Sequence, residues 1–179
     1  GLLGAVGLAR SAGVELPAAP GTGVVVGATR LDRVPDAGGT DRYLLAAPAH
    51  APLPGWCGEL PRLPPSAWWR SEIEAAVPTV FAATQEKFVP QMINFEVVGG
   101  VSFSKGCYPG QEVVARSQYR GKLKRRMQVA QRVAAAPAGA DVFADGEAVA
   151  VGTVVMAATA PGGGFDLLIE CPQEKSAAT

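Results

Sequence analysis

Two short regions near the start of the chain are rich in apolar residues, and this pattern predicts two neighbouring strands. The first region, Gly23 to Arg30, is apolar and β-branched, and the second, Asp41 to Ala47, reads Asp-Arg-Tyr-Leu-Leu-Ala-Ala. Gly38-Gly39 stands between them and is typical of a turn. Before these strands, the apolar residues between Leu2 and Leu8 have the spacing of a short amphipathic helix, which Gly13 can end.

A further helix is predicted from Ser66 to about Ala76. Ser66 can cap its first turn, tryptophan and isoleucine side chains supply its apolar faces, and Pro78 stops it. The preceding stretch, Pro48 to Pro65, is rich in proline and is expected to be a surface connection. Residues 97–103 are predicted to be extended, and another helix is predicted from about Gln111 to Tyr119, with Gly121 at its end.

After Lys124 the pattern changes to short strands that are separated by Pro-Ala-Gly, Asp-Gly and Pro-Gly-Gly-Gly turns. The predicted strands are Met127–Val133, Ala140–Ala144, Glu147–Ala158 and Phe165–Cys171. Short strands joined by tight turns are typical of a small barrel or sandwich. We therefore predict an α+β chain with two domains, a body of residues 1–121 and a C-terminal β-barrel of residues 122–179.

The composition argues against two classes of protein. Of the 179 residues, 48% are apolar, which is ordinary for a globular protein and argues against disorder. No run of about eighteen apolar residues occurs, so we expect no membrane-spanning segment. The chain starts at Gly1 without a charged and then apolar leader, so we expect no signal peptide.

The three cysteines, Cys57, Cys107 and Cys171, are too few and too scattered for a disulfide framework or a zinc knuckle. Free thiols fit a reducing cytosol, so a cytoplasmic location is expected. His50 has no ligand partner at metal spacing, and we predict no metal site.

Charge is unevenly spread, although the formal net charge is zero. Residues 113–140 contain no acid, and their basic residues are Arg116, Arg120, Lys122, Lys124, Arg125, Arg126 and Arg132. Such a stripe is usually a solvated face, but it can also attract an anionic ligand. Tyr119 is the one aromatic residue within it, so we do not expect a stacking platform for nucleic acid.

The candidate chemistry lies in the loop Lys105-Gly106-Cys107-Tyr108-Pro109-Gly110-Gln111-Glu112. The thiolate is the reactive form of cysteine, and a nearby cation and a helix N-terminus both favour it. Lys105 stands two residues before Cys107, and the predicted helix begins a few residues after it. We therefore predict that Cys107 is a reactive cysteine that Lys105 assists. The alternative is a buried, inert cysteine in a Gly-Pro turn.

This loop is similar to the signature of the YgfZ family, which reads Lys-Gly-Cys-Tyr/Phe-Thr/Pro-Gly-Gln-Glu. The flanking residues match as well: Phe88-Val89-Pro90-Gln91, Asn94, Gly99-Gly100-Val101-Ser102-Phe103, Val114-Ala115-Arg116 and Tyr119-Arg120-Gly121. The similarity is close over residues 68–126 and loose elsewhere. An eight-residue motif with ordered flanks on both sides is a specific signal.

The resemblance implies a folate-binding protein related to the T-protein, the tetrahydrofolate-dependent aminomethyltransferase of glycine cleavage. Members of the family support the maturation or repair of iron–sulfur enzymes, and their motif cysteine, matched here by Cys107, is required for activity. Full-length relatives carry a further N-terminal region. The resemblance therefore implies a partial GcvT-like folate-binding body, with tetrahydrofolate or a derivative as its cofactor and iron–sulfur proteins as partners.

The resemblance also suggests which residues contact the cofactor. Glu74 matches an acid that can accept hydrogen bonds from the aminopyrimidine edge of a pterin, although a solvated helix face is the alternative. Ala76 stands where the family usually has glycine, and Glu72 where it usually has arginine. Beside a folate pocket, the stripe could hold a glutamyl tail or an anionic client such as an RNA. The expected cofactor contacts are Glu74, Gln111, Glu112 and Arg116.

Three functions are compatible with the sequence. The first is a folate-binding maturation factor in which Cys107 bonds transiently to a client, a metal or a sulfur species. The second is a folate-dependent one-carbon transferase like the T-protein, and the third is a binding module with a structural cysteine. Whether the chain is itself an enzyme is left open by the sequence.

Overall fold

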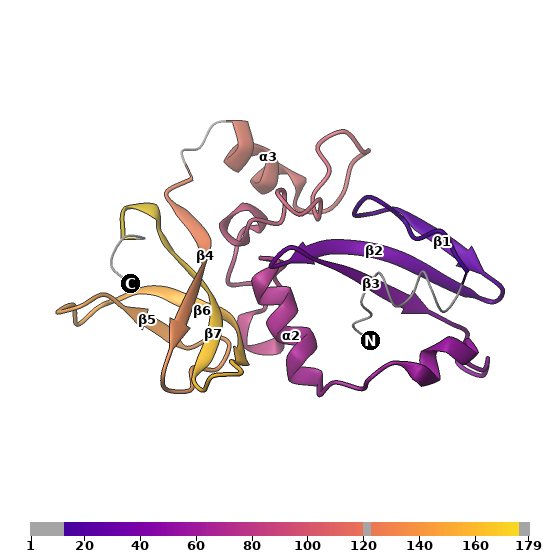
Figure 1. Cartoon of the computed structure of the whole chain (residues 1–179). Coiled ribbons are helices and arrows are strands. Elements are labelled where there is room, and N and C mark those ends of the chain that lie inside the picture. The colour runs from indigo at the N-terminus through magenta and orange to yellow at the C-terminus, as the bar shows by residue number, and fades with distance from the viewer. Residues whose placement is uncertain (1–12, 120–122, 176–179) are drawn as a thin grey trace. The chain divides into compact units, whose positions relative to one another are not determined.

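The computed structural model describes residues 13–119 and 123–175 (Figure 1). The helix that we expected between Leu2 and Leu8 lies outside the described residues, and so does Gly121. The chain divides into two compact units, Gly1–Ser71 and Glu72–Thr179. The domain boundary that we predicted at residue 121 falls inside the second unit, at an undescribed position, and it stays a prediction.

The first unit contains a three-stranded antiparallel sheet in the order β1-β2-β3. Its strands are β1 (Gly23–Val26), β2 (Thr29–Ala37) and β3 (Thr40–Ala46). The single strand predicted from Gly23 to Arg30 was wrong, because Gly27 adopts a φ of 60° and the chain turns there into β2. The turn predicted at Gly38-Gly39 is confirmed, and both glycines have positive φ, which suits a two-residue hairpin turn.

A small apolar core lies on one face of this sheet. Leu31 of β2 pairs with Val24 on one side and with Leu45 on the other, so the three side chains share a face. Leu31 and Tyr43 are buried, and Leu16, Val24, Leu45 and Trp56 pack around them. Most of β2 was missed in the sequence because it includes arginine, aspartate and a proline at a register shift.

The helix predicted at residues 66–76 is confirmed as α2 (Pro65–Glu74). It follows the proline-rich connection, whose one regular element is the short 3₁₀-helix η1 (Gly55–Glu59). A Schellman motif ends α2: the Ala76 N–H donates to the Ile73 carbonyl and the Val77 N–H to the Glu72 carbonyl, both at 2.9 Å. Ala76 therefore has a φ of 52°, a conformation that normally selects glycine.

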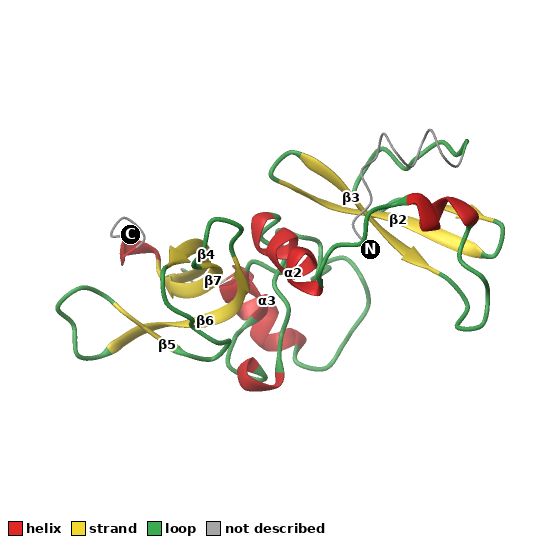
Figure 2. Ribbon diagram, turned by 60° about the horizontal axis from the view of Figure 1, so that its bottom comes forward, coloured by secondary structure: helices red, strands yellow, loops and turns green. Residues whose placement is uncertain are grey.

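The second unit contains a four-stranded antiparallel sheet in the order β4-β7-β6-β5 (Figure 2). Its strands are β4 (Arg125–Arg132), β5 (Asp141–Phe143), β6 (Ala150–Thr159) and β7 (Phe165–Pro172). All four predicted strands are thus confirmed, with ends shifted by a few residues. The predicted barrel is not formed, because β4 and β5 are the two edges of an open sheet and no pairing joins them in the described chain.

The sheet of the second unit is covered on both faces. Alternate residues of β7 enter two clusters, Leu168 in one, and Leu167 and Ile169 in the other. The first cluster comprises Ile73, Ile93, Met127, Val155, Met156, Ala158 and Leu168, with phenylalanines around it. The second comprises Ala130, Ala136, Val154, Leu167, Ile169 and Cys171. Burial on both faces explains why β7 reads as a nearly continuous apolar run.

Turns and short helices connect α2 to the candidate loop. They include η2 (Ala82–Thr84) and η3 (Pro90–Ile93). Residues 97–103 do not form the extended segment that we predicted, because residues 97–99 form a turn and residues 100–103 have no helix or strand. Gly99 has a φ of 76°, and a Cβ on Gly100 would lie 2.2 Å from the ring of Phe95. Both glycines are therefore needed for a tight turn. In class, the fold is mixed and sheet-rich with few helices, and its likeness to the T-protein body stays a prediction.

Candidate functional site

The thiol of Cys107 is exposed in the loop before α3 (Gln111–Tyr119), which confirms that this cysteine is accessible. Cys171 is buried and Cys57 is half-buried. Burial raises the pKa of both of these thiols, so each forms a thiolate less readily than an ordinary cysteine. The alternative of a buried Cys107 is thereby excluded, whereas its reactivity stays a prediction.

Lys105 contacts the aromatic ring next to Cys107. Its Nζ lies 5.0 Å from the centroid of the Tyr108 ring, within the range of a cation–π interaction. Its backbone N–H donates to Ser102 Oγ at 3.2 Å, which closes the loop locally. The Lys105 side chain is exposed, and the assistance to Cys107 that we predicted stays a prediction.

Gln111 stabilises the junction between the loop and α3. Its Oε1 accepts a hydrogen bond from the Tyr108 N–H at 3.3 Å, and its own N–H donates to the Tyr108 carbonyl at 3.3 Å. Gly110 directly before the helix has a φ of 80°, which lets the chain turn sharply. These two hydrogen bonds give the Gln111 side chain a structural role at the start of α3. Its expected contact with a cofactor stays a prediction.

Glu112 and Arg116 lie one helical turn apart on the exposed side of α3. Together with Ala115 and Tyr119 they line a shallow depression with a volume of about 520 Å³. The ring of Tyr119 meets that of Phe103 edge to face, with centroids 6.2 Å apart, which links the loop to the end of the helix. Two of the predicted cofactor contacts are therefore brought together here.

Glu74 is the last residue of α2 and is exposed. Neither Glu74 nor Cys107 is among the described residues that line the depression on α3. The structure thus brings Glu112 and Arg116 together, and places Cys107 in the loop that precedes their helix. It does not put Glu74 into the same depression.

A polar network that sequence reasoning did not single out holds the segment before the loop. We call it the Gln91 clamp, and it consists of Gln91, Asn94, Glu96 and Arg126. Gln91 is fully buried, and its Nε2 donates to the Val114 carbonyl of α3 at 2.7 Å. Arg126 of β4 donates to the Gln91 carbonyl at 2.9 Å and to Asn94 Oδ1 at 3.3 Å, and it pairs with the Glu96 carboxylate.

The Gln91 clamp is completed by Asn94, whose Nδ2 donates to the Met127 carbonyl at 3.0 Å. Asn94 itself has a φ of 57°, a conformation that asparagine tolerates better than most residues. The clamp ties η3 to α3 and to β4 through side chains, and it thereby fixes the start of the helix that follows Cys107. Two of its members, Gln91 and Asn94, stand among the residues that flank the family-like motif, and this was the one signal of the clamp in the sequence.

The basic stripe is not one continuous free surface. Arg125 pairs with Glu170 and donates to the Val151 carbonyl at 2.9 Å, and Arg126 belongs to the Gln91 clamp. These two arginines thus have partners within the unit, and the anion-binding role of the stripe stays a prediction. Arg116 and Lys124 are exposed, while Arg120 and Lys122 lie outside the described residues.

Two general features follow from the same described residues. Within residues 13–119 and 123–175, no group of three or more His, Cys, Asp or Glu side chains is arranged to hold a metal ion. In the same ranges, no helix combines the length and the apolar character that crossing a membrane requires.

The chain is similar over part of its length to a known protein. No protein-family model matches the chain. A segment of 62 residues is 50% identical to the tRNA-modifying protein YgfZ of Vibrio atlanticus (strain LGP32). The matched segment covers 35% of this chain and 19% of that relative, so the chain spans about a fifth of the length of the curated protein that it matches. The likeness gives partial support to a YgfZ-like family.

Proposed function

We propose that this chain is part of a folate-binding protein that assists the maturation or repair of iron–sulfur proteins, with Cys107 as its reactive group. The observation that carries the proposal is the exposed Cys107 in a loop whose eight residues match the YgfZ signature. The 50% identity to a YgfZ protein over 62 residues supports the same family. The Cys107 thiolate would act in one of two ways. It binds a metal of the client after its proton is released to solvent, or it attacks a disulfide or persulfide of the client, so that a new sulfur–sulfur bond forms as the old one breaks and the displaced sulfur leaves as a thiolate.

A reduced folate fits the chemistry of exposed groups on α2 and α3, the two helices that carry the expected cofactor contacts. The Arg116 guanidinium on α3 can bind the carboxylates of a glutamyl tail, because planar guanidinium groups pair well with carboxylates. The Glu74 carboxylate can accept two hydrogen bonds from the aminopyrimidine edge of the pterin. Glu112 and Gln111 would border the same region, Glu112 as a lining residue of the depression and Gln111 as the cap of its helix.

Cysteine labelling tests the reactive group. With iodoacetamide near neutral pH, we expect Cys107 to be alkylated faster than Cys57, and Cys57 faster than Cys171, because burial raises the pKa of the latter two. The rate at each cysteine is read by mass spectrometry over a series of pH values. Lys105→Ala should slow Cys107, whereas Lys124→Ala, which removes another exposed lysine, should not. Equal rates at all three cysteines would contradict the proposal.

Titration with folinic acid, a stable reduced folate, tests the cofactor. Glu74→Gln and Arg116→Gln should each weaken binding by about tenfold, the usual value of a hydrogen bond to a charged group. Asp145→Asn removes an exposed carboxylate between β5 and β6 and serves as the matched control. If neither this chain nor its complete protein binds folinic acid, the folate assignment is wrong.

The maturation role is tested in cells that lack their own YgfZ-type protein. The complete protein should restore the activity of iron–sulfur enzymes, and Cys107→Ser should abolish this effect while the protein remains folded. Aminomethyl transfer by the purified complete protein would instead support the one-carbon transferase. Full restoration by Cys107→Ser would leave only a binding role.

A further inference from the structure

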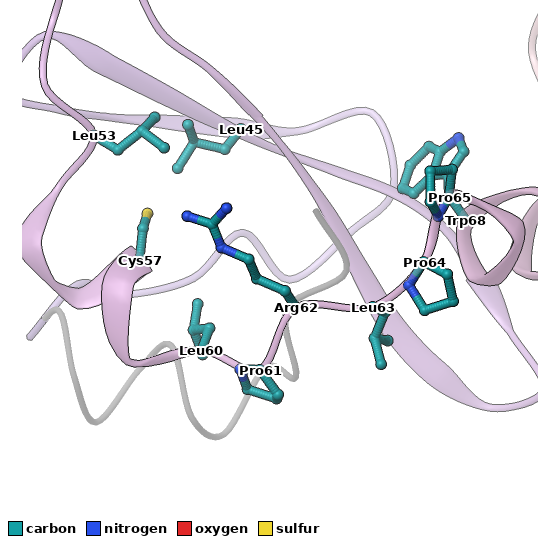
Figure 3. A pocket seen from close by; sticks show the side chains of 10 residues that line it. All are labelled: Leu45, Leu53, Cys57, Leu60, Pro61, Arg62, Leu63, Pro64, Pro65 and Trp68. Atoms are coloured by element: carbon teal, nitrogen blue, oxygen red, sulfur yellow. The ribbon is translucent and has the colours of Figure 1, made fainter.

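The first unit has a pocket of its own, and none of its described lining residues is one of the site residues assigned above. It has a volume of about 510 Å³, within the range of pockets that hold small molecules. Its walls come from β3, η1, the proline-rich connection and the start of α2. Figure 3 shows its described lining residues, which are Leu45, Leu53, Cys57, Leu60, Pro61, Arg62, Leu63, Pro64, Pro65 and Trp68.

The frame of this pocket is rigid at two places. Pro61, Pro64 and Pro65 fix the backbone along one wall, because the proline ring restricts φ. Trp68 is held by Arg42, whose guanidinium carbon lies 5.4 Å from the centroid of the indole ring. Arg42 is in turn fixed by hydrogen bonds to Ser71 Oγ at 3.0 Å and to the Pro35 carbonyl at 2.7 Å. A ligand would therefore enter a preformed site, with little cost for ordering its walls.

One cation faces these apolar walls. Figure 3 shows the Arg62 side chain extended across the pocket toward Leu45 and Cys57. Arg62 forms no hydrogen bond or ion pair with any other residue in the described part of the chain. Burial raises the pKa of the Cys57 thiol, so this thiol is neutral near pH 7. The described lining thus carries a single formal charge, and it is positive.

We propose that this pocket binds a small amphipathic carboxylate, with the carboxylate on the Arg62 guanidinium and an apolar chain or ring against the leucine, proline and Trp68 walls. Arginine suits this role because its planar guanidinium can donate two parallel hydrogen bonds to one carboxylate. The apolar walls supply affinity through buried area but distinguish poorly between apolar bodies. Selectivity therefore rests on the charge. This inference does not depend on the function proposed for Cys107.

The experiment compares octanoate with octanamide, a neutral ligand of the same shape, by calorimetric titration of the whole 179-residue chain. Octanoate should bind about tenfold more tightly than octanamide, because only octanoate can form charge-assisted hydrogen bonds. Arg62→Gln should remove this difference and leave the affinity for octanamide nearly unchanged. Arg132→Gln removes an exposed arginine of the second unit and should retain the full difference.

Cys57 provides a second readout that locates the ligand. In a Cys107→Ser background, octanoate should slow the alkylation of Cys57, and Arg62→Gln should abolish this protection while circular dichroism shows an unchanged fold. Three results would overturn the proposal: no binding of octanoate, equal affinities for octanoate and octanamide, or binding without protection of Cys57. Protection by folinic acid but not by octanoate would also overturn it, since the pocket would then belong to a folate site.

Discussion

The sheets of the two units are stabilised by different kinds of side chain. Among the described residues of the first unit, the buried apolar cluster is small and contains Leu31 and Tyr43, and arginine side chains form several of the polar contacts. Arg33 pairs with Asp36 at 2.7 Å and with Asp41 at 2.5 Å, and its Nη1 donates to the Ala18 carbonyl at 2.9 Å. In the second unit two apolar clusters cover both faces of the sheet.

This difference indicates how each unit should respond to change. Buried apolar area stabilises a protein in proportion to the area removed from water and is insensitive to moderate salt. Exposed ion pairs contribute little each and are screened by salt. The second unit should therefore lose more free energy of unfolding when a cavity is made in its core, and the stability of the first unit should depend more on salt. All three tryptophans, Trp56, Trp68 and Trp69, lie in the first unit, so their fluorescence reports on that unit.

The largest expected effect is that of a cavity in the second unit. Leu168 is fully buried in the middle of β7, and Leu168→Ala should lower the free energy of unfolding of that unit by about 3–5 kcal/mol. Leu31→Ala should cost less, about 2–3 kcal/mol, because the smaller core around Leu31 can relax into the space. Hydrogen exchange of β7 amides and tryptophan fluorescence in urea measure the two units separately. A larger cost at Leu31 than at Leu168 would reverse the comparison.

The next largest effect on the free energy of unfolding is expected for an arginine of the second unit that pairs with a buried acid. Glu170 is buried, and Arg125→Gln would leave its carboxylate without its ion-pair partner. We expect a loss of about 2 kcal/mol, below the usual cost of breaking a buried pair, because about a third of the Arg125 side chain is exposed. Arg132→Gln, at the exposed end of the same strand, should change stability by less than about 0.5 kcal/mol.

Urea unfolding followed by hydrogen exchange in β4 and β7 measures these two variants. Equal stabilities would mean that the Arg125–Glu170 pair contributes nothing beyond a surface ion pair. A cost at Arg132 as large as that at Arg125 would point instead to a general effect of net charge.

In the second unit the strands could be predicted from the sequence, whereas the order of the strands and the partners of the arginines could not. The four C-terminal strands were predictable because their apolar runs are bounded by glycine and proline turns. Their open order was not predictable, since it depends on which edges pair over long distances. The ion pairs of Arg125 and Arg126 were not predictable from the basic stripe, because their partners, Glu170 and Glu96, are remote in sequence.

The candidate site divides in the same way. The exposure of Cys107 and the helix that follows it were predictable from a local motif of glycines and proline. The Gln91 clamp was not, because the burial of Gln91 depends on contacts with α3 and β4. Polar residues within an apolar neighbourhood give no sequence signal that separates a buried network from a solvated turn.

A smaller effect of opposite sign, a gain in stability, is expected where a residue of the second unit other than glycine has a positive φ. In the first unit the described residues with positive φ are all glycines, whereas the second unit has Ala76, Glu86 and Asn94 in this region. Ala76→Gly should therefore stabilise the protein by about 1 kcal/mol, because it relieves the strain at C′ of the Schellman motif. Ala75→Gly, one residue earlier and without positive φ, should destabilise it slightly. Thermal unfolding measures the stability of both variants. A loss of stability in Ala76→Gly would show that the backbone of Ala76 is not strained.

The smallest effect belongs to an exposed pair on the first sheet, Arg30 and Asp32. Arg30 Nε donates to both carboxylate oxygens of Asp32, at 2.8 and 2.9 Å, and these hydrogen bonds lower the pKa of Asp32 in the folded state. A carboxyl group with a folded-state pKa below its unfolded value stabilises the fold above the unfolded pKa, which is about 3.9. This contribution is lost as the pH falls through the folded-state value. Because both side chains are solvent-exposed, high salt should also remove most of it.

The urea midpoint of tryptophan fluorescence measures this pair in the first unit. Asp32→Asn should lower the midpoint slightly at neutral pH and low salt, and the difference from the unchanged protein should vanish in acid, where Asp32 is protonated in both states. Arg30→Gln should reproduce the loss, and the double variant should add nothing to it, because the pair is already broken. Asp145→Asn, an exposed acid of the second unit, should leave this midpoint unchanged. If the difference persists in acid or in high salt, Asp32 contributes through β2 itself and not through its charge.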